Sequence, residues 1–224
     1  MNNKKIFINP VWTNVCQYNA VEVGKNVKNF KVGDRVVGAN SVPCFHCYFC
    51  KRKEYSLCEN LQYLNGAYAE YIVIPSQILK YNYLHIPDDL DYKEAALVEP
   101  LACVLHGIDE INIKLGDTVA VIGCGPIGLM FVKLSSLKGA RVIAADFSEY
   151  RLKQAEKFGA VKTINASYKD YPQRIKDITE ESKGVDVAIE ATGYPEAWEN
   201  AINMIKVVVE STGVFNTTEK ASAH

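Results

Sequence analysis

Four cysteines within fifteen residues are the feature that most restricts what this chain of 224 residues can fold into. They follow the spacing C-x2-C-x2-C-x7-C and are Cys44, Cys47, Cys50 and Cys58. Three short steps and one return in a tight loop can bring four thiolates to the corners of a tetrahedron, each about 2.3 Å from a Zn²⁺ ion, with no position left for water. The spacing therefore predicts a structural zinc lobe, in which the sulfurs lie within about 4 Å of one another.

Other arrangements of these cysteines fit the sequence less well. A disulfide framework is typical of secreted chains, and the first twenty residues show no secretory signal because Asn9, Pro10 and Asn14 interrupt any apolar run. A ferredoxin-type iron–sulfur motif ends in C-x3-C-P, whereas the last step here is seven residues. His46 could replace one thiolate, but beside four cysteines it is expected to point to solvent. The other cysteines are expected to be reduced thiols in apolar surroundings: Cys16, Cys103 and Cys124.

Composition and charge exclude several classes of protein. Hydrophobic residues make up 48% of the chain and charged residues 23%, as in ordinary globular domains. A net charge of −1 from 25 basic and 26 acidic residues offers no field for nucleic acid or anionic lipid. No apolar run approaches the roughly 20 residues of a membrane span. We therefore expect a cytoplasmic protein of one or two domains, with no nucleic-acid or membrane partner.

A glycine-rich turn between two predicted elements is the second informative motif. It follows the apolar run 119–122, which is typical of a parallel strand buried on both faces, and it precedes a helical pattern over 129–138. In such a G-x-G-x-x-G turn the first glycine bends the chain, the second admits a pyrophosphate and the third lets helix and strand pack closely. The amino end of the helix favours the phosphates. The residues expected to contact the cofactor here are Gly123, Gly125, Pro126, Ile127 and Gly128.

An acidic residue completes this dinucleotide fingerprint. The apolar strand 141–145 ends in Asp146, eighteen residues beyond Gly128. A carboxylate at this place accepts hydrogen bonds from the ribose hydroxyls and repels a 2′-phosphate, so the sequence favours NAD over NADP. Arg151 could flank the adenine or pair with a glutamate on its own helix, and the sequence leaves both open.

Strand and helix patterns continue to alternate beyond this motif. Such alternation predicts a parallel sheet. In an open parallel sheet, ligands lie at the carboxyl ends of the strands. Thr192 and Gly193, which follow the apolar strand, are thus either a wall for the nicotinamide half of a dinucleotide or an ordinary strand-to-helix turn. The expected elements are a helix over 148–158, a strand over 161–164, a helix over 171–182 and a strand over 185–189.

The segment before the glycine turn has a different pattern. Residues 21–38 alternate apolar and polar side chains with glycines at the turns, which predicts antiparallel strands, and 66–75 repeats the pattern. Residues 86–105 look helical. A β-rich segment therefore gives way to an α/β segment near residue 110.

Together these motifs resemble the zinc-containing medium-chain alcohol dehydrogenases, especially the polyol and threonine dehydrogenase branch. The resemblance covers about residues 21–206 and rests on V-E-V-G-K-N-V-x-x-F-x-V-G-D-R-V, the four-cysteine lobe, G-A-Y-A-E-Y-x-x-x-P, V-E-P-L-A-C-x-L-H-G and G-D-T-V-A-V-I-G-C-G-P-I-G-L. It implies an α/β fold, in which a Rossmann-type parallel sheet that binds NAD, over 111–206, is preceded by a partial GroES-like β domain with the structural zinc lobe, over 21–110. The implied reaction oxidises a small secondary alcohol or polyol, with a catalytic zinc polarising the alkoxide while hydride passes to NAD. A homo-oligomer is left open.

The catalytic part of the family pattern is incomplete. The family holds its catalytic zinc with an upstream cysteine and with the histidine of a His-Glu pair, which should fall where this chain has Asn14 and Val15. Cys16 is the only upstream thiol, and its surroundings do not match. Glu99 matches the glutamate that the polyol branch places at the zinc or its water; without the resemblance it reads as a helix-surface acid. One carboxylate does not hold a catalytic zinc, which needs about three protein ligands. We therefore expect an impaired dehydrogenase or, as the alternative, a non-catalytic remnant that binds zinc and a dinucleotide.

The two ends of the chain do not follow the family. Residues 1–20 form an unassigned head, and 207–224 form a tail that looks foreign. In about its last seventeen residues the chain resembles glyceraldehyde-3-phosphate dehydrogenase, through E-S-T-G-V-F and T-x-E-K-A. We interpret the chain as a joined or frameshifted gene product, with a naturally shortened protein as the alternative. Val207–Val209 is apolar enough to add a parallel strand beside 185–189.

Overall fold

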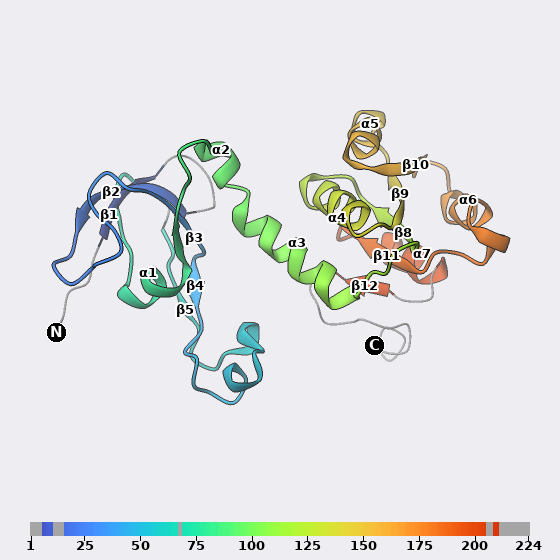
Figure 1. Cartoon of the computed structure of the whole chain (residues 1–224). Coiled ribbons are helices and arrows are strands. Elements are labelled where there is room, and N and C mark those ends of the chain that lie inside the picture. The colour runs from blue at the N-terminus through green and yellow to red at the C-terminus, as the bar shows by residue number, and fades with distance from the viewer. Residues whose placement is uncertain (1–5, 11–15, 67–68, 205–207, 211–224) are drawn as a thin grey trace. The chain divides into compact units, whose positions relative to one another are not determined.

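The structure of the protein is a computed structural model that describes residues 6–10, 16–66, 69–204 and 208–210 (Figure 1). The chain divides into two compact units, Met1–Glu99 and Pro100–His224. Among the helices that are described, none has the length and apolar character needed to cross a membrane.

The first unit is built on a five-stranded antiparallel sheet with the strand order β6-β1-β2-β3-β7. The alternating pattern of residues 21–38 predicted the antiparallel pairing, and it falls on the end of one strand and the whole of the next. The described part of the segment 66–75 contributes less than its pattern predicts, because of these residues only Ile72 and Val73 pair. The strands are β1 (Ile6–Pro10), β2 (Cys16–Val23), β3 (Arg35–Gly38), β6 (Ile72–Val73) and β7 (Tyr83–His85).

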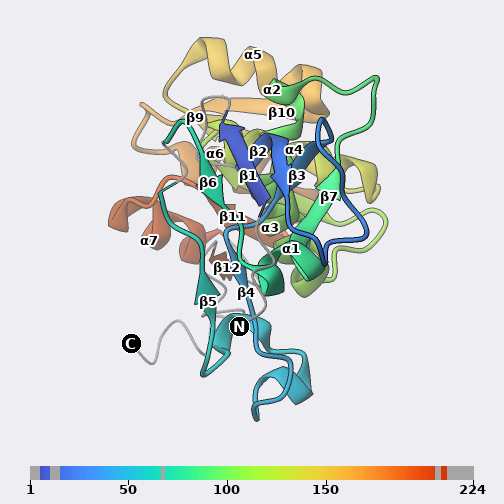
Figure 2. The same ribbon diagram turned by 90° about the vertical axis from the view of Figure 1, so that its left-hand side faces the viewer.

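A short ladder carries the cysteine segment of this unit. Strand β4 (Ser41–Val42) pairs antiparallel with β5 (Gln62–Tyr63), and the chain between them contains two single-turn 3-10 helices, η1 (Cys50–Arg52) and η2 (Tyr55–Leu57). In both views the segment extends from this ladder away from the five-stranded sheet (Figures 1 and 2). Helix α1 (Ser76–Asn82) packs into the core of the unit. That core consists of Ala20, Val36, Val42, Leu64, Ile72, Ile74, Ile78, Leu79 and Tyr83.

Two helices replace the single helix expected over 86–105. A proline disfavours helical backbone in the residue before it, so no helix begins at Ile86, which precedes Pro87. Helix α2 (Tyr92–Ala95) instead begins at a capping box, in which Asp91 accepts from the Glu94 N–H at 2.8 Å and Glu94 accepts from the Asp91 N–H at 3.0 Å. Helix α3 (Val98–Ile111) follows and runs six residues beyond the expected end at residue 105.

The second unit contains a five-stranded parallel sheet with the order β10-β9-β8-β11-β12. The apolar runs at 119–122, 141–145 and 185–189 fall on its three inner strands, which are buried on both faces as predicted. The last strand pairs with β11 in parallel, Ala188 opposite Val208 and Ile189 opposite Val209, which confirms the strand expected beside 185–189. The strands are β8 (Thr118–Ile122), β9 (Arg141–Asp146), β10 (Ala160–Asn165), β11 (Val187–Glu190) and β12 (Val208–Glu210).

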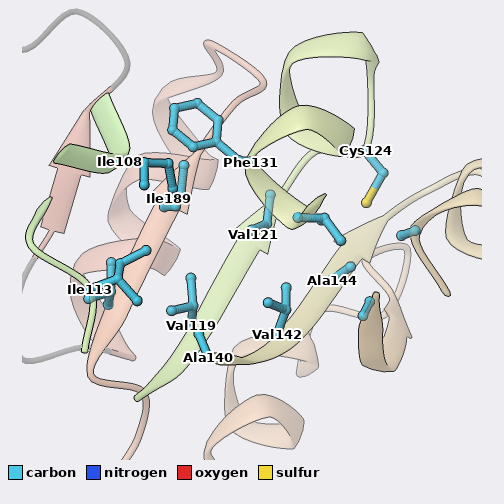
Figure 3. Close-up of a cluster of buried hydrophobic side chains, with 14 of the residues drawn as sticks. Ile108, Ile113, Val119, Val121, Cys124, Phe131, Ala140, Val142, Ala144 and Ile189 are labelled. Atoms are coloured by element: carbon cyan, nitrogen blue, oxygen red, sulfur yellow. The ribbon is translucent and has the colours of Figure 1, made fainter. Parts of the chain in front are cut away.

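Helices cover both faces of this sheet. Alternate strand residues pack with α3, α4 (Pro126–Leu137) and α5 (Glu149–Phe158) on one face, where Ile108, Phe131 and Ile189 meet (Figure 3). The other strand residues pack with α6 (Tyr171–Asp177) and α7 (Pro195–Asn203) on the opposite face. The two clusters make this unit three layers thick, with β8 as the central strand of the sheet.

Helix α6 is shorter than the pattern over 171–182 indicates. It ends at Asp177, and a separate 3-10 turn, η3 (Glu180–Ser182), follows. Thr179 separates the two because its backbone is extended and its hydroxyl donates to the Lys176 carbonyl at 2.6 Å. A threonine hydroxyl that bonds to a nearby backbone carbonyl offers the chain an alternative to continuing the helix.

Candidate metal and dinucleotide sites

The four predicted cysteines converge on one point of the first unit. Their sulfurs lie within 4.8 Å of one another, and those of Cys44 and Cys50 are 3.9 Å apart. The cluster is therefore slightly wider than the separation of about 4 Å expected for ligands of one zinc ion. Phe45 has a left-handed backbone (φ 64°) just after the first cysteine, and this turn lets the Cys47 N–H reach the Cys44 sulfur at 3.4 Å.

Backbone N–H groups favour the negatively charged form of two of these sulfurs, those of Cys47 and Cys58. The Cys58 sulfur accepts from the Cys44 N–H at 3.2 Å and from the Asn60 N–H at 3.4 Å. Burial acts to raise the pKa of Cys58, but these two donors, together with the Cys44 and Cys50 sulfurs, outweigh it and the pKa is lowered. A backbone N–H from Cys50 lowers the pKa of Cys47 to about 6, whereas burial raises that of Cys50 to about 12. Two of the four sulfurs, those of Cys47 and Cys58, are thus favoured as thiolates, and the four together form a donor set that suits Zn²⁺.

His46 does not join the cysteine cluster. Its ring is exposed, and its Nδ1 lies 2.7 Å from the Cys44 carbonyl oxygen, to which it can donate. Of the other cysteines with described side chains, Cys103 is exposed and Cys124 is buried. Within the described part of the chain, no second group of three or more metal-binding side chains comes together.

The three glycines of the turn between β8 and α4 lie in different structural surroundings. Gly123 has a left-handed backbone (φ +92°), and a Cβ there would lie 2.6 Å from the Thr192 methyl group. A Cβ on Gly128 would lie 1.8 Å from the Gly123 carbonyl oxygen. Gly125 has an ordinary extended backbone (φ −68°, ψ −176°), and a Cβ there would meet no atom within 4 Å. The first and third glycines are thus required by the fold, while the second faces open space at the amino end of α4.

The turn continues into α4 through two further residues predicted to contact a cofactor. Pro126 occupies the first position of the helix, where its missing N–H leaves no hydrogen bond unmade. Ile127 follows and is 37% exposed. The free N–H groups of this first turn give the helix end a partial positive charge beside Gly125.

Asp146 anchors the glycine turn from the end of β9. Its carboxylate is buried, with 7% exposed, and accepts from the Cys124 N–H at 2.7 Å and from the Ser148 N–H at 2.8 Å. The acid therefore faces the glycine turn, as the fingerprint predicts. The exposed guanidinium of Arg151 lies 3.7 Å from the same carboxylate, so this side chain pairs with Asp146 rather than with a glutamate of its helix.

A second buried acid lies at the end of β11 and was missed by the sequence analysis. Glu190 is 1% exposed, and its carboxylate accepts from the backbone N–H and the hydroxyl of Thr192 and from the Gly193 N–H. Thr192 and Gly193 lie next to the glycine turn, because the Thr192 methyl group faces Gly123. A charged residue that ends a fully apolar strand just before Thr-Gly was the available signal in the sequence.

Three predicted residues of the catalytic zinc shell remain, of which the structure describes Glu99. Glu99 is half-buried in the first turn of α3, where the two units divide. Asn14 and Val15 lie outside the described residues, as does the turn that follows Glu210.

Comparisons with known proteins match both units. The sequence model of the alcohol dehydrogenase GroES-like domain matches residues 19–87, and that of zinc-binding dehydrogenases matches 126–215, which extends beyond residue 206 into the tail. The chain is 38% identical over 197 residues to sorbitol dehydrogenase of Bacillus subtilis (strain 168), covering 85% of this chain and 54% of that protein. It is 41% identical over 182 residues to erythritol/L-threitol dehydrogenase of Mycolicibacterium smegmatis, covering 78% and 49%. The chain thus spans about half the length of the curated relatives it matches.

Solved structures show the same likeness. A protein assigned as a zinc-binding dehydrogenase from Sinorhizobium meliloti 1021, solved with bound NADP, has a TM-score of 0.81 and 29% identity, covering 93% of this chain and 69% of that one. The 2R,3R-butanediol dehydrogenase of Bacillus subtilis has a TM-score of 0.71 and 33% identity, covering 87% and 56%.

Proposed function

Because this chain belongs to the zinc-containing medium-chain dehydrogenase family, we propose that it serves the oxidation of a small secondary alcohol or polyol with hydride transfer to NAD. In this proposal the second unit binds the dinucleotide and the cysteine lobe of the first unit holds a structural zinc. The family's chemistry, when its cofactors are bound, is transfer of a hydride from the alcohol carbon to the nicotinamide ring. The residues of this chain bind and orient the dinucleotide.

The observation that carries the proposal is the glycine at position 125. Its backbone conformation is open to any residue, and a side chain there would meet nothing in the protein. The fold gives no reason for a glycine at this position, whereas a pyrophosphate that approaches the backbone of the turn does. The partial positive charge at the start of α4 favours the same ligand.

We propose that NAD is preferred to NADP. Asp146 offers a buried carboxylate at the end of β9, where the adenosine ribose of a dinucleotide lies in such folds. A 2′-phosphate would meet this negative charge, which Arg151 offsets only in part from an exposed position 3.7 Å away. Titration of the purified protein with NADH and NADPH by fluorescence tests this, and equal or reversed affinities would refute the role given to Asp146.

A second candidate function follows from the ligand count for a catalytic zinc. Asn14 and Val15 stand where the family has its histidine and glutamate, and Glu99 alone matches the family's catalytic zinc shell. These residues favour a protein that binds a structural zinc and a dinucleotide without turning over alcohols. Under this alternative the chain contains one zinc ion, held by the four cysteines, and Glu99 binds none.

One pair of measurements separates the two candidates. Zinc content per chain is determined on the purified protein, and NAD reduction is followed with sorbitol, threonine and butanediol. A dehydrogenase with a complete site contains two zinc ions and reduces NAD, and Glu99→Gln abolishes that activity. The non-catalytic module contains one zinc ion, binds NADH and reduces no NAD with any of these alcohols.

A further inference from the structure

Glu190 is a buried acid whose carboxylate, among the described residues, accepts hydrogen bonds from the turn that follows it. The carboxylate accepts from the Thr192 N–H, from the Thr192 hydroxyl, and from the Gly193 N–H at 3.0 and 3.1 Å to its two oxygens. Among the described residues, no cation forms an ion pair with it. A buried acid lowers stability unless its hydrogen bonds are made. The presence of Glu190 at this position therefore indicates that the conformation of the turn needs the hydrogen bonds that its carboxylate accepts.

The hydrogen bonds determine the shape of this turn. Gly193 has a left-handed backbone (φ +78°), and the Tyr194 N–H donates to the Thr192 hydroxyl at 3.1 Å. The turn is thereby closed around one carboxylate. Without an acceptor at Glu190, two backbone N–H groups would lose their partner and the turn would be free to change its conformation.

Glu190 and Asp146 occupy corresponding places on either side of the glycine turn. The strand order puts β9 on one side of β8 and β11 on the other, and each of these neighbours ends in a buried acid that accepts backbone N–H groups. Asp146 holds the glycine turn, whereas Glu190 holds the turn of Thr192 and Gly193. A dinucleotide bound across the carboxyl end of β8 places its adenosine half over β9 and its other half over β11.

We infer that Glu190 is a positioning residue, which fixes the turn of Thr192 and Gly193 as the wall that receives the nicotinamide half of the dinucleotide. The inference rests on the proposed dinucleotide binding. It assigns the two acids to different halves of one ligand. Asp146 acts on the adenosine and phosphate half, and Glu190 acts on the nicotinamide half without touching it.

Truncated ligands test this division of roles. Kd values are measured by calorimetry for NADH and for ADP, which carries the adenosine half and both phosphates but no nicotinamide. Glu190→Gln keeps the size of the side chain but turns one acceptor into a donor that faces N–H groups. We expect it to raise the Kd for NADH about tenfold and to leave the Kd for ADP within about twofold. Asp146→Asn is expected to raise both values.

Controls separate the inference from a general loss of structure. Glu199→Gln changes an exposed acid of α7 and should leave both affinities unchanged. Thr192→Val keeps Glu190 but removes the hydroxyl that donates to its carboxylate and accepts from the Tyr194 N–H. If Glu190→Gln does not fold, this variant should show the same selective loss of NADH affinity to a smaller extent. Equal weakening of NADH and ADP by Glu190→Gln, or no weakening of either, overturns the inference. A wild-type protein that binds neither ligand refutes the proposed dinucleotide binding itself.

Discussion

The cysteine lobe and the glycine turn are built on opposite principles. The lobe gathers four side chains from one segment of fifteen residues, and its ligand atoms lie within 4.8 Å of one another. The glycine turn gathers backbone groups from the ends of three strands, and its two anchoring acids, Asp146 and Glu190, are 44 positions apart in the sequence. The first site depends on side-chain chemistry, and the second depends on the sheet that brings the strand ends together. A change to one site should therefore leave the other intact.

The largest effect is expected from the loss of one lobe cysteine. Cys47→Ser removes a sulfur that a backbone N–H prepares as a thiolate, and three thiolates bind zinc far more weakly than four. Zinc content should fall from one ion per chain to nearly none, while the Kd for NADH stays the same. Cys103→Ser is the matched control at an exposed position. A variant that keeps its zinc would show that the lobe does not work as a four-ligand site.

The next largest effect is expected in thiol reactivity, which should differ between Cys47 of the lobe and Cys124 of the glycine turn. The pKa of Cys47 is lowered to about 6 by a backbone N–H, so in metal-free protein this group is mostly thiolate at neutral pH. Burial raises the pKa of Cys124, inside the glycine turn, to about 12, so it stays a thiol. After chelation, iodoacetamide at pH about 7 should modify Cys47 at least about a hundred times faster than Cys124. Mass spectrometry of peptides measures both rates, and comparable rates would contradict these pKa shifts.

A methyl group on the third glycine should damage the fold of the second unit. In Gly128→Ala the new Cβ would lie 1.8 Å from the Gly123 carbonyl oxygen, and a backbone atom cannot move aside as a side chain can. We expect the free energy of unfolding of this unit to fall by about 3 kcal/mol, as in other overpacked sites. Urea unfolding followed by the signal of the second unit measures this. Zinc content, measured below the transition, should not change.

The same methyl group on the second glycine should weaken NADH binding and leave the stability of the fold unchanged. Gly125→Ala places its Cβ in open space with an ordinary backbone, so the free energy of unfolding should stay constant or rise by about 0.5 kcal/mol. The Kd for NADH should rise about tenfold or more, because the methyl group occupies the approach to the turn. Calorimetry and urea unfolding on the same preparation provide both values. An unchanged Kd would remove the main support for dinucleotide binding.

The two regions also differ in how far sequence alone could predict them. The cysteine spacing predicted all four ligands because they lie close together in the sequence. The apolar runs predicted the parallel strands because a strand buried on both faces consists of consecutive apolar residues. The anchoring role of Glu190 depends on β11 lying beside β8, which no local pattern reveals. The helix expected over 86–105 failed for a local reason, since Pro87 and the Asp91 capping box outweigh the alanine-rich composition. The role of Glu99 stays a prediction because it depends on groups outside the described residues.

The residue at position 125 can also show whether selection has kept ligand binding. Replacing Gly123 or Gly128 disturbs the protein before any ligand arrives, so both would persist in a descendant that had stopped binding dinucleotides. Gly125 has no such protection, because the folded chain tolerates a side chain there. Under random drift it should be the first glycine of the three to disappear. Among descendants of this gene, the residue at position 125 would therefore show whether selection still acts on the ligand or only on the fold.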